Sequence, residues 1–274
     1  MTDQATRYDR IAAGYDQWWA PVLAPSAVAL LDIVDAAVID GARDLLDVGV
    51  GTGNLSIAAL QRWPDVEISA IDASREMVNA VEGLVAERVP GARHRFHGHV
   101  AFAAELPFGD ASFDAAMSSF VLQLVPSRPA ALREIRRVLR PGGFFGHVTW
   151  LVDARVFAPD RIFDRLLEEY GFENDDDPNR KGDIPSVARA AGELRHAGFR
   201  DVVATGALLE HAFSVESYIS FLTEFDEESL FEEMERAERR RFLAEFRARL
   251  MGLRADEMAF RVPIVYAAGR RSDG

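Results

Sequence analysis

Residues 45–54, LLDVGVGTGN, decide the fold of this chain, because a short apolar run passes through three glycines into a helical pattern. An apolar run without polar alternation is typical of a parallel strand covered by helices on both faces. Glycines at alternate positions let the backbone turn sharply and leave room for a ligand. The stretch therefore predicts a strand, a tight loop and a helix, with a ligand site at the carboxyl end of the strand.

The spacing of these glycines separates two kinds of ligand site. A dinucleotide-binding loop has the pattern Gly-x-Gly-x-x-Gly, whose third glycine lets the helix pack closely on the strand. Here the third glycine is Gly53, and Asn54 stands where the dinucleotide pattern has glycine. An acid, Asp47, precedes Gly49 by two residues. Three glycines alone are weak evidence, because turns use glycine for backbone reasons in many proteins.

A second feature makes the prediction specific. Residues 66–71, VEISAI, form a second predicted strand, and Asp72 follows directly. The interval from the glycine loop is about the 20 residues expected for an acid that binds a ribose. A carboxylate there can accept hydrogen bonds from both ribose hydroxyls.

With these features the chain resembles the class I S-adenosylmethionine-dependent methyltransferases, in particular their small-molecule, ubiquinone-biosynthesis-like branch. The matching text is residues 46–53, Asp72 with Met77, LPF at 106–108, SFD at 112–114, residues 132–143 and AGF at 197–199. The resemblance is strong from residue 45 to about residue 143. It implies S-adenosyl-L-methionine as the cofactor and methyl transfer to a small-molecule acceptor, with O-, N- and C-methylation all open.

The resemblance also implies roles for single residues. Asp47 would organise the loop and the methionine moiety, Gly49, Gly51 and Gly53 would admit the cofactor, and Asp72 would hold the ribose. Further cofactor contacts are expected from Tyr15, Ala73, Met77 and Phe120. No catalytic base is assigned, because displacement at a sulfonium needs alignment and exclusion of water more than covalent catalysis.

Two interpretations stay open for the N-terminal segment. Tyr8 and Tyr15 lie seven residues apart, on one face of a predicted helix. In the first, the helix is held to the domain by its aromatic residues. In the second, which the resemblance implies, the segment folds over the cofactor and a tyrosine makes a cation–π contact with the sulfonium.

One departure from the family concerns adenine. The family's usual pattern has an acid four residues before the LPF motif, where it binds the adenine amino group. A gapless alignment puts Phe102 at this place, and a short insertion puts His99 there. Since the acid is missing, adenine must be held by stacking, by backbone groups or by another side chain.

We expect no metal site. His94 and His97 would point to opposite faces of a strand, whereas a metal needs three or four converging ligands. The acidic residues 173–177 lack the spacing of a calcium loop and are expected to form a solvated loop. His147, in the strand predicted at 144–150, is expected to be a core or edge residue rather than a catalytic base.

Composition narrows the function further. The chain has 274 residues, 49% of them hydrophobic, enough for one packed catalytic domain. A net charge of −13 argues against nucleic acid and against an anionic membrane surface as partners. The absence of cysteine excludes disulfides and thiolate ligands. No 18-residue apolar run and no charged leader followed by an apolar run is present, so we expect a cytoplasmic location. We also expect a monomer or homodimer, and the resemblance implies a small-molecule acceptor.

The expected fold is an α/β, Rossmann-like, doubly wound, mostly parallel sheet with helices on both faces. To it the resemblance adds a seventh, antiparallel strand. We expect a single domain over 1–274, with a helical cap at 1–40, a cofactor-binding core at 41–150 and a substrate-side half at 151–274.

Several elements of this fold are expected at definite places. An apolar stripe that includes Val28 marks a helix over the sheet, and Ser119, Phe120 and Gln123 are expected at the cavity wall. A helix is expected at 128–139, a strand at 199–205, and a last strand at 264–268, limited by Pro263.

A helical insertion is expected at about 213–255, before the last strand. Its apolar residues Leu230, Met234, Phe242, Phe246 and Leu250 are spaced four or eight residues apart, as on one face of a helix. Two interpretations are open: a lid over the acceptor pocket, or a dimer contact.

Two other functions compete with methyl transfer. A nicotinamide-dependent reductase would share the loop and Asp72 but should have glycine at position 54. A non-catalytic relative that binds the cofactor without turnover fits the missing adenine acid.

Overall fold

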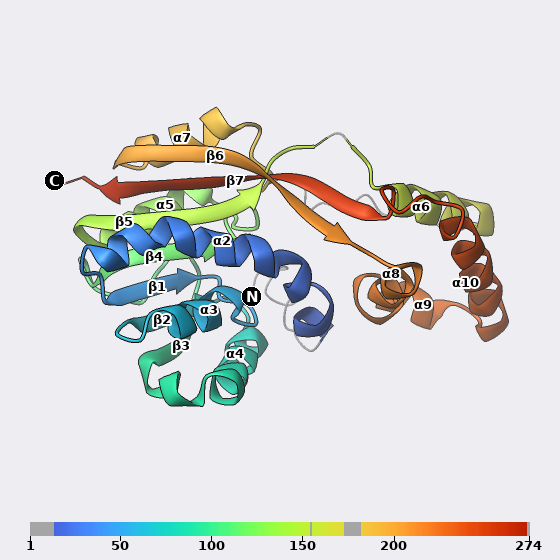
Figure 1. Cartoon of the computed structure of the whole chain (residues 1–274), viewed down its shortest axis with the longest axis horizontal. Helices are drawn as coiled ribbons and strands as arrows, with labels where there is room; N and C mark the ends of the chain where they lie inside the picture. The colour runs from blue at the N-terminus through green and yellow to red at the C-terminus, as the bar shows by residue number, and fades with distance from the viewer. Residues whose placement is uncertain (1–13, 154, 173–181, 273–274) are drawn as a thin grey trace. The chain divides into compact units, whose positions relative to one another are not determined.

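The computed structural model describes residues 14–153, 155–172 and 182–272. The chain forms two compact units (Figure 1). The first, here called the sheet unit, comprises residues 1–152, 179–207 and 263–274, and the second, the helical unit, comprises 153–178 and 208–262. The expected organisation as one catalytic domain stays a prediction. Tyr8 and the acidic residues 173–177 lie outside the described residues.

A seven-stranded sheet has the order β3-β2-β1-β4-β5-β7-β6. The strands are β1 (Asp44–Val48), β2 (Glu67–Asp72), β3 (Phe96–Val100), β4 (Phe113–Ser119), β5 (Leu139–Trp150), β6 (Phe199–Ala212) and β7 (Ala259–Arg271). The pairs from β3 through β5 are parallel, and β7 lies antiparallel to β5. This confirms the predicted doubly wound sheet with its antiparallel strand, since the order reverses beside β1.

Helices cover both faces of the sheet, as predicted (Figure 1). One face carries α2 (Ala20–Ile39), α3 (Asn54–Arg62) and α4 (Arg75–Arg88), and the other carries α5 (Arg128–Val138) and α7 (Val187–His196). A 3₁₀ helix, η1 (Pro90–Arg95), leads into β3. The apolar residues of α5 and α7 share a core cluster with Leu46, Ile71 and Phe145.

Helix α2 corrects the expectation that the chain has no long apolar run. By length and composition it is apolar enough to cross a membrane. In the sheet unit its buried residues Leu30 and Val34 lie over Gly146 of β5, where an added Cβ would stand 3.5 and 3.6 Å from their side chains. The apolar composition thus serves close packing on the sheet. Val28, expected in the same stripe, is exposed instead.

The ends of several elements differ from the prediction. Helix α5 ends at Val138, and β5 already begins at Leu139. Strand β6 extends to Ala212. Strand β7 begins at Ala259, so Pro263 does not limit the start of the last strand as expected. Proline lacks only a donor, and the Pro263 carbonyl still accepts a hydrogen bond from the Leu151 N–H at 2.9 Å.

The helical unit contains α6 (Ala158–Tyr170), α8 (Val215–Phe221), a π-helical turn η3 (Leu222–Asp226), α9 (Glu228–Glu233) and α10 (Arg236–Leu250). The predicted insertion is therefore broken into short pieces rather than continuous. Its apolar stripe packs on α6, where the Phe163 ring lies 5.8 Å from Phe242 and 5.5 Å from Phe246. Phe242, Phe246 and Leu250 are fully buried there, which leaves them no surface for the dimer contact.

Candidate cofactor site

The glycine loop joins the ends of β1 and β2. The N–H groups of Gly49 and Val50 both donate to the Ile71 carbonyl, at 2.8 and 2.9 Å. The Gly53 N–H closes the loop on the Val50 carbonyl at 2.9 Å, and Gly53 caps α3 with a φ of 93°. These bonds place the start of α3 beside the carboxyl ends of the strands, as the sequence predicted.

The three glycines do different things, although all have positive φ. An added Cβ would stand 2.2 Å from the Val121 side chain at Gly49 and 2.5 Å from the Val81 side chain at Gly53. At Gly51 the nearest atom would be Cε1 of Tyr15, at 3.8 Å. Gly49 and Gly53 therefore permit packing, and Gly51 leaves space open.

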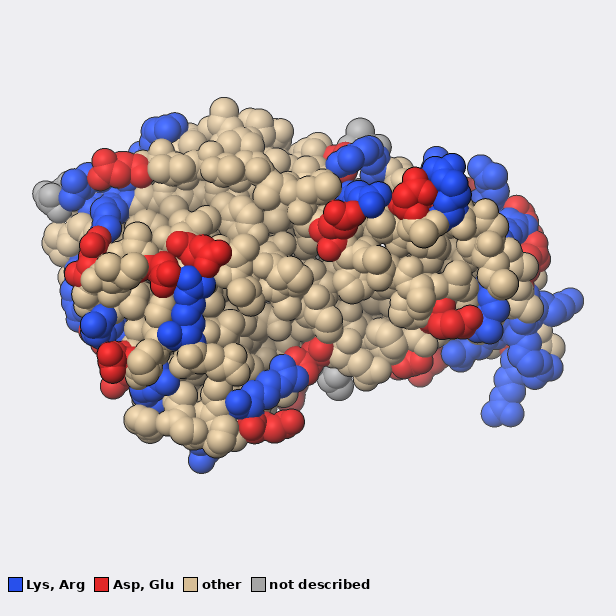
Figure 2. Space-filling model, viewed as in Figure 1, with Lys and Arg blue, Asp and Glu red and all other residues tan. Residues whose placement is uncertain are grey.

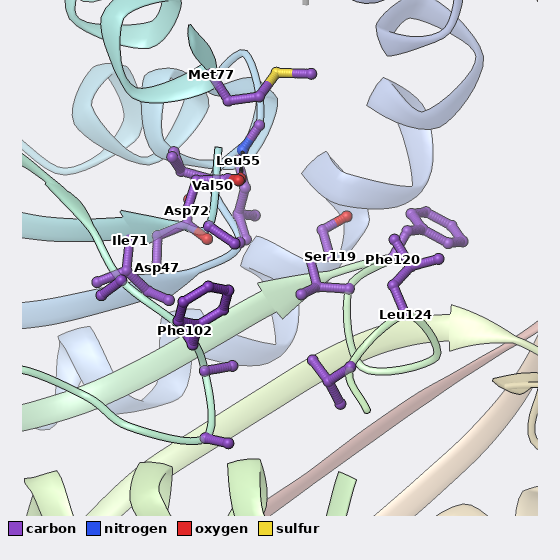
Figure 3. A pocket seen from close by; sticks show the side chains of 18 of the residues that line it. Asp47, Val50, Leu55, Ile71, Asp72, Met77, Phe102, Ser119, Phe120 and Leu124 are labelled. Carbon is purple, nitrogen blue, oxygen red and sulfur yellow. Dashed lines mark hydrogen bonds between the residues drawn. The ribbon is translucent and has the colours of Figure 1, made fainter. Parts of the chain in front are cut away.

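That space belongs to a cavity of about 390 Å³ at the carboxyl ends of β1, β2 and β4 (Figure 3). The volume lies within the range of small-molecule sites. All the predicted cofactor residues except Gly53 line it: Tyr15, Asp47, Gly49, Gly51, Asp72, Ala73, Met77 and Phe120. Their binding of a cofactor stays a prediction.

Of the residues expected at the cavity wall, Ser119 and Phe120 line it and Gln123 does not. The Gln123 amide instead donates to the Phe120 carbonyl at 2.7 Å and accepts from the Thr149 hydroxyl at 2.6 Å. Gln123 thus holds the wall from behind. Sequence position alone did not separate the two roles.

Asp72 lies at the end of β2, facing the glycine loop. Its carboxylate accepts hydrogen bonds from the N–H groups of Gly51 and Ser74, each at 2.9 Å. A carboxylate has lone pairs for about four hydrogen bonds, so these contacts are compatible with acceptance from ribose hydroxyls. The position therefore fits the predicted ribose-binding role.

Asp47 is the most deeply buried acid of the cavity. Only 1% of its surface is exposed, and its carboxylate accepts a hydrogen bond of 2.6 Å from the Ser56 hydroxyl. Burial, with a smaller contribution from the negative charge of Asp72, raises the pKa of Asp47 to about 7 against the lowering effect of the Ser56 hydrogen bond. A buried carboxylate of this kind is suited to pairing with a cationic ligand group. It fits the ammonium of a methionine moiety.

Residues 14–20 lie beside this cavity. Residues 14–18 are helical, and Asp16 forms an ion pair of 2.5 Å with Arg88 of α4. Tyr15 lines the cavity, as the second interpretation of this segment requires. The Asn54 amide donates to the Ala20 carbonyl at 2.7 Å, which ties the start of α2 to the start of α3. This role of Asn54 was not predicted.

Two further residues at the cavity combine structural and site features. Met77 is 1% exposed and still lines the cavity, so it packs in the core and borders the ligand space. Phe120 has a φ of 55°, which is rare for a bulky residue and costs about 1–3 kcal/mol. Its ring lies 4.3 Å from that of Trp150. Strain of this kind is concentrated at functional sites.

Histidine plays no part in the cavity. His147 is 2% exposed, its ring stacks on Phe145 at 5.5 Å, and burial lowers its pKa to about 3. It is thus a core residue, as expected. Over residues 14–153, 155–172 and 182–272, no three His, Asp or Glu side chains converge as metal ligands.

Residues 45–143 match the family model of the methyltransferase domain. The fold and the glycine loop agree with this match, so residues 45–143 are similar to the class I S-adenosylmethionine-dependent methyltransferases. It is similar to a malonyl-[acyl-carrier protein] O-methyltransferase of Xylella fastidiosa, with 33% identity over 44% of this chain and 37% of that protein. It is also similar to a ubiquinone/menaquinone biosynthesis C-methyltransferase of Geobacter sp., with 39% identity over 38% of this chain and 44% of that protein.

The match spans less than half the length of both relatives. A solved structure, the YcgJ protein of Bacillus subtilis, superposes with a TM-score of 0.57 and 18% identity. The superposition covers 91% of this chain and 99% of that one, which supports the fold alone.

Proposed function

We propose that this chain transfers the methyl group of S-adenosylmethionine to a small-molecule acceptor. The observation that carries the proposal is the cavity at the ends of β1, β2 and β4, into which Gly51 opens and which Asp47 and Asp72 border. The cofactor supplies a methyl group already activated by its sulfonium. The family supports the reaction class, and the relatives' names support O- or C-methylation as examples of it.

In this proposal each cavity residue has a binding or positioning task. Asp72 accepts from the ribose hydroxyls, and Asp47 pairs with the ammonium of the methionine moiety. Tyr15 covers the cavity above Gly51 and helps to exclude water, which strengthens the electrostatic contacts inside. His147 does not act as the base, because it is buried outside the cavity wall.

We further propose a cytoplasmic monomer or homodimer that binds neither nucleic acid nor membrane. The net charge of −13 argues against nucleic acid and against an anionic membrane surface as partners. Figure 2 shows acidic and basic side chains close to one another on the visible face, on either side of a broad area with few charged residues.

Calorimetric titration with S-adenosylhomocysteine and with oxidised nicotinamide dinucleotide tests the cofactor. We expect binding of S-adenosylhomocysteine only. Binding of the dinucleotide alone would favour the reductase, and binding of neither would contradict the proposal. Binding of S-adenosylhomocysteine without methyl transfer to any of a panel of phenols, carboxylates, amines and quinols would favour the non-catalytic relative.

A further inference from the structure

The turn that follows β3 forms one wall of the cavity. The Ala101 N–H donates to the Asp72 carbonyl at 2.9 Å, which fixes the turn beside the end of β2. Residues 101–105 all line the cavity. This turn occupies the position at which the sequence lacks the acid expected for adenine.

The structure separates the two residues that the sequence offered in place of this acid. His99 does not line the cavity, and its ring meets that of Phe108 edge-on at 5.2 Å. Phe102 lines the cavity and keeps 42% of its surface exposed. Figure 3 shows its ring at the wall that also carries Ile71 and Asp72. An exposed aromatic ring beside a ribose-binding position is suited to stacking on a base.

The same turn brings an acid next to this ring. Phe102 and Glu105 form an antiparallel bridge, closed by a hydrogen bond of 3.0 Å from the Glu105 N–H to the Phe102 carbonyl. Residues paired in this way direct their side chains to the same side. Glu105 lines the cavity as well. The backbone turn thus places a carboxylate beside position 102, three residues later in the sequence.

We infer that Phe102 and Glu105 together recognise the adenine of the cofactor: the Phe102 ring stacks on the base, and the Glu105 carboxylate accepts a hydrogen bond from the 6-amino group. This inference rests on the proposed function. It names the residues that replace the missing acid and predicts selectivity for a 6-amino purine, because a carboxylate accepts hydrogen bonds but repels a 6-oxo group.

Two probes test the inference by calorimetry on the full chain: S-adenosylhomocysteine and its 6-oxo analogue, S-inosylhomocysteine. The wild type should prefer the adenosyl compound by about tenfold or more. Glu105→Ala should weaken only the adenosyl compound and remove the preference. Glu105→Gln should also reduce the preference, because its amide can donate to a 6-oxo group.

Phe102→Ala should weaken both compounds by about tenfold or more and keep the preference, since stacking does not depend on the 6-substituent. Phe102→Tyr should restore both affinities. Val100→Ala and Glu87→Gln are matched controls outside the cavity and should change neither affinity. Thermal unfolding of each variant checks that it is folded.

A preference that survives Glu105→Ala would overturn the role of Glu105. Unchanged affinities in Phe102→Ala would overturn the role of Phe102. A wild type that binds both compounds equally would overturn the inference and leave the proposed function intact. A wild type that binds neither compound would instead contradict the proposed function.

Discussion

The two units bury different kinds of residue. In the sheet unit, buried polar side chains accompany the apolar core, several of them at the carboxyl ends of the strands or behind the cavity wall. Over the described residues, all of the buried polar or charged residues belong to this unit: Ser26, Asp47, Thr52, Ser56, Ser74, Ser118, Gln123, His147 and Thr149. In the helical unit the largest buried side chains are aromatic: Phe163, Phe213, Tyr218, Phe221, Phe231, Phe242 and Phe246.

The difference in buried residues distinguishes a unit that carries a binding site, the sheet unit, from one whose core serves stability, the helical unit. Burial of a polar group costs free energy unless a partner compensates it, whereas burial of aromatic rings is favourable by itself. The charged groups of the helical unit stay near its surface, where Arg249 pairs with Glu169 and Glu245 and adds little stability. Substitutions at the cavity of the sheet unit should therefore change binding, and substitutions in the core of the helical unit should change stability.

The largest effect is expected for Gly51→Val, which should abolish binding of S-adenosylhomocysteine. A branched side chain at this φ of 52° would enter the cavity. Gly53→Ala is the matched control for backbone strain, since its Cβ would meet Val81 and so lower the stability. Calorimetry and thermal unfolding separate the two effects, and wild-type affinity in Gly51→Val would show that the loop does not hold the cofactor.

In the helical unit, Phe242→Ala should lower the free energy of unfolding by about 3–5 kcal/mol, because it removes a fully buried ring. Urea denaturation measures the loss. Phe102→Ala removes an exposed ring and should cost far less stability. If both variants lost the same stability, the distinction between the units would fail.

Asp72→Ala should weaken binding of S-adenosylhomocysteine by about 1.5–3 kcal/mol, the range for hydrogen bonds to a charged group. The fold should survive, because Asp72 lies at the edge of the cavity, where its carboxylate accepts from the backbone N–H groups of Gly51 and Ser74. An unchanged dissociation constant in a folded variant would remove Asp72 from the site.

Asp47 should make stability depend on pH. Its pKa rises from 3.8 to about 7 on folding, so the folded state holds a proton that the unfolded state releases. Stability should therefore fall as the pH rises from about 4 to about 7. Asp47→Asn should remove this slope. Between pH 5 and pH 8, the free energy of unfolding of the variant should therefore rise by about 1–3 kcal/mol relative to that of the wild type. Urea denaturation measures the free energy of unfolding of both proteins over this pH range. If the two values changed with pH in parallel, the raised pKa of Asp47 would be contradicted.

The smallest effect concerns the lid interpretation, which stays a prediction. The short elements α8, η3 and α9 are expected to open locally more often than α10. Hydrogen exchange there should slow about threefold when cofactor and acceptor close the site, more than in α5. Equal protection with and without ligand would exclude a lid, and protection that rises with protein concentration alone would indicate self-association.

The sequence predicted the elements whose signals are local. The glycine loop and the strand that ends at Asp72 both depend on neighbours within a few residues. What it did not predict depends on distant partners. Gly53 faces Val81, and Gln123 accepts a hydrogen bond from Thr149. Neither role can be predicted from the neighbouring residues, because each partner lies more than 20 residues away in the sequence.

The helical insertion shows the same limit. The four-residue spacing of its apolar residues continues through Met234. The backbone of Met234 is nevertheless extended, with a ψ of 135°, and α9 ends there. The pattern predicted the burial of four of its five residues, whereas Leu230 is only half-buried, and it did not predict where the helices break. Packing on α6 accounts for the burial, and α6 lies more than 50 residues earlier in the chain.

The hydrogen bond from Asn54 to Ala20 also bears on how such loops evolve. A single change, Asn54→Gly, would convert the spacing of this loop into the dinucleotide pattern. The same change would cut the tie that holds the start of α2, at the border of the cavity. A protein that reached the dinucleotide spacing by this change would lose the hydrogen bond at the start of α2 before it gained a new ligand. Selection would disfavour such an intermediate.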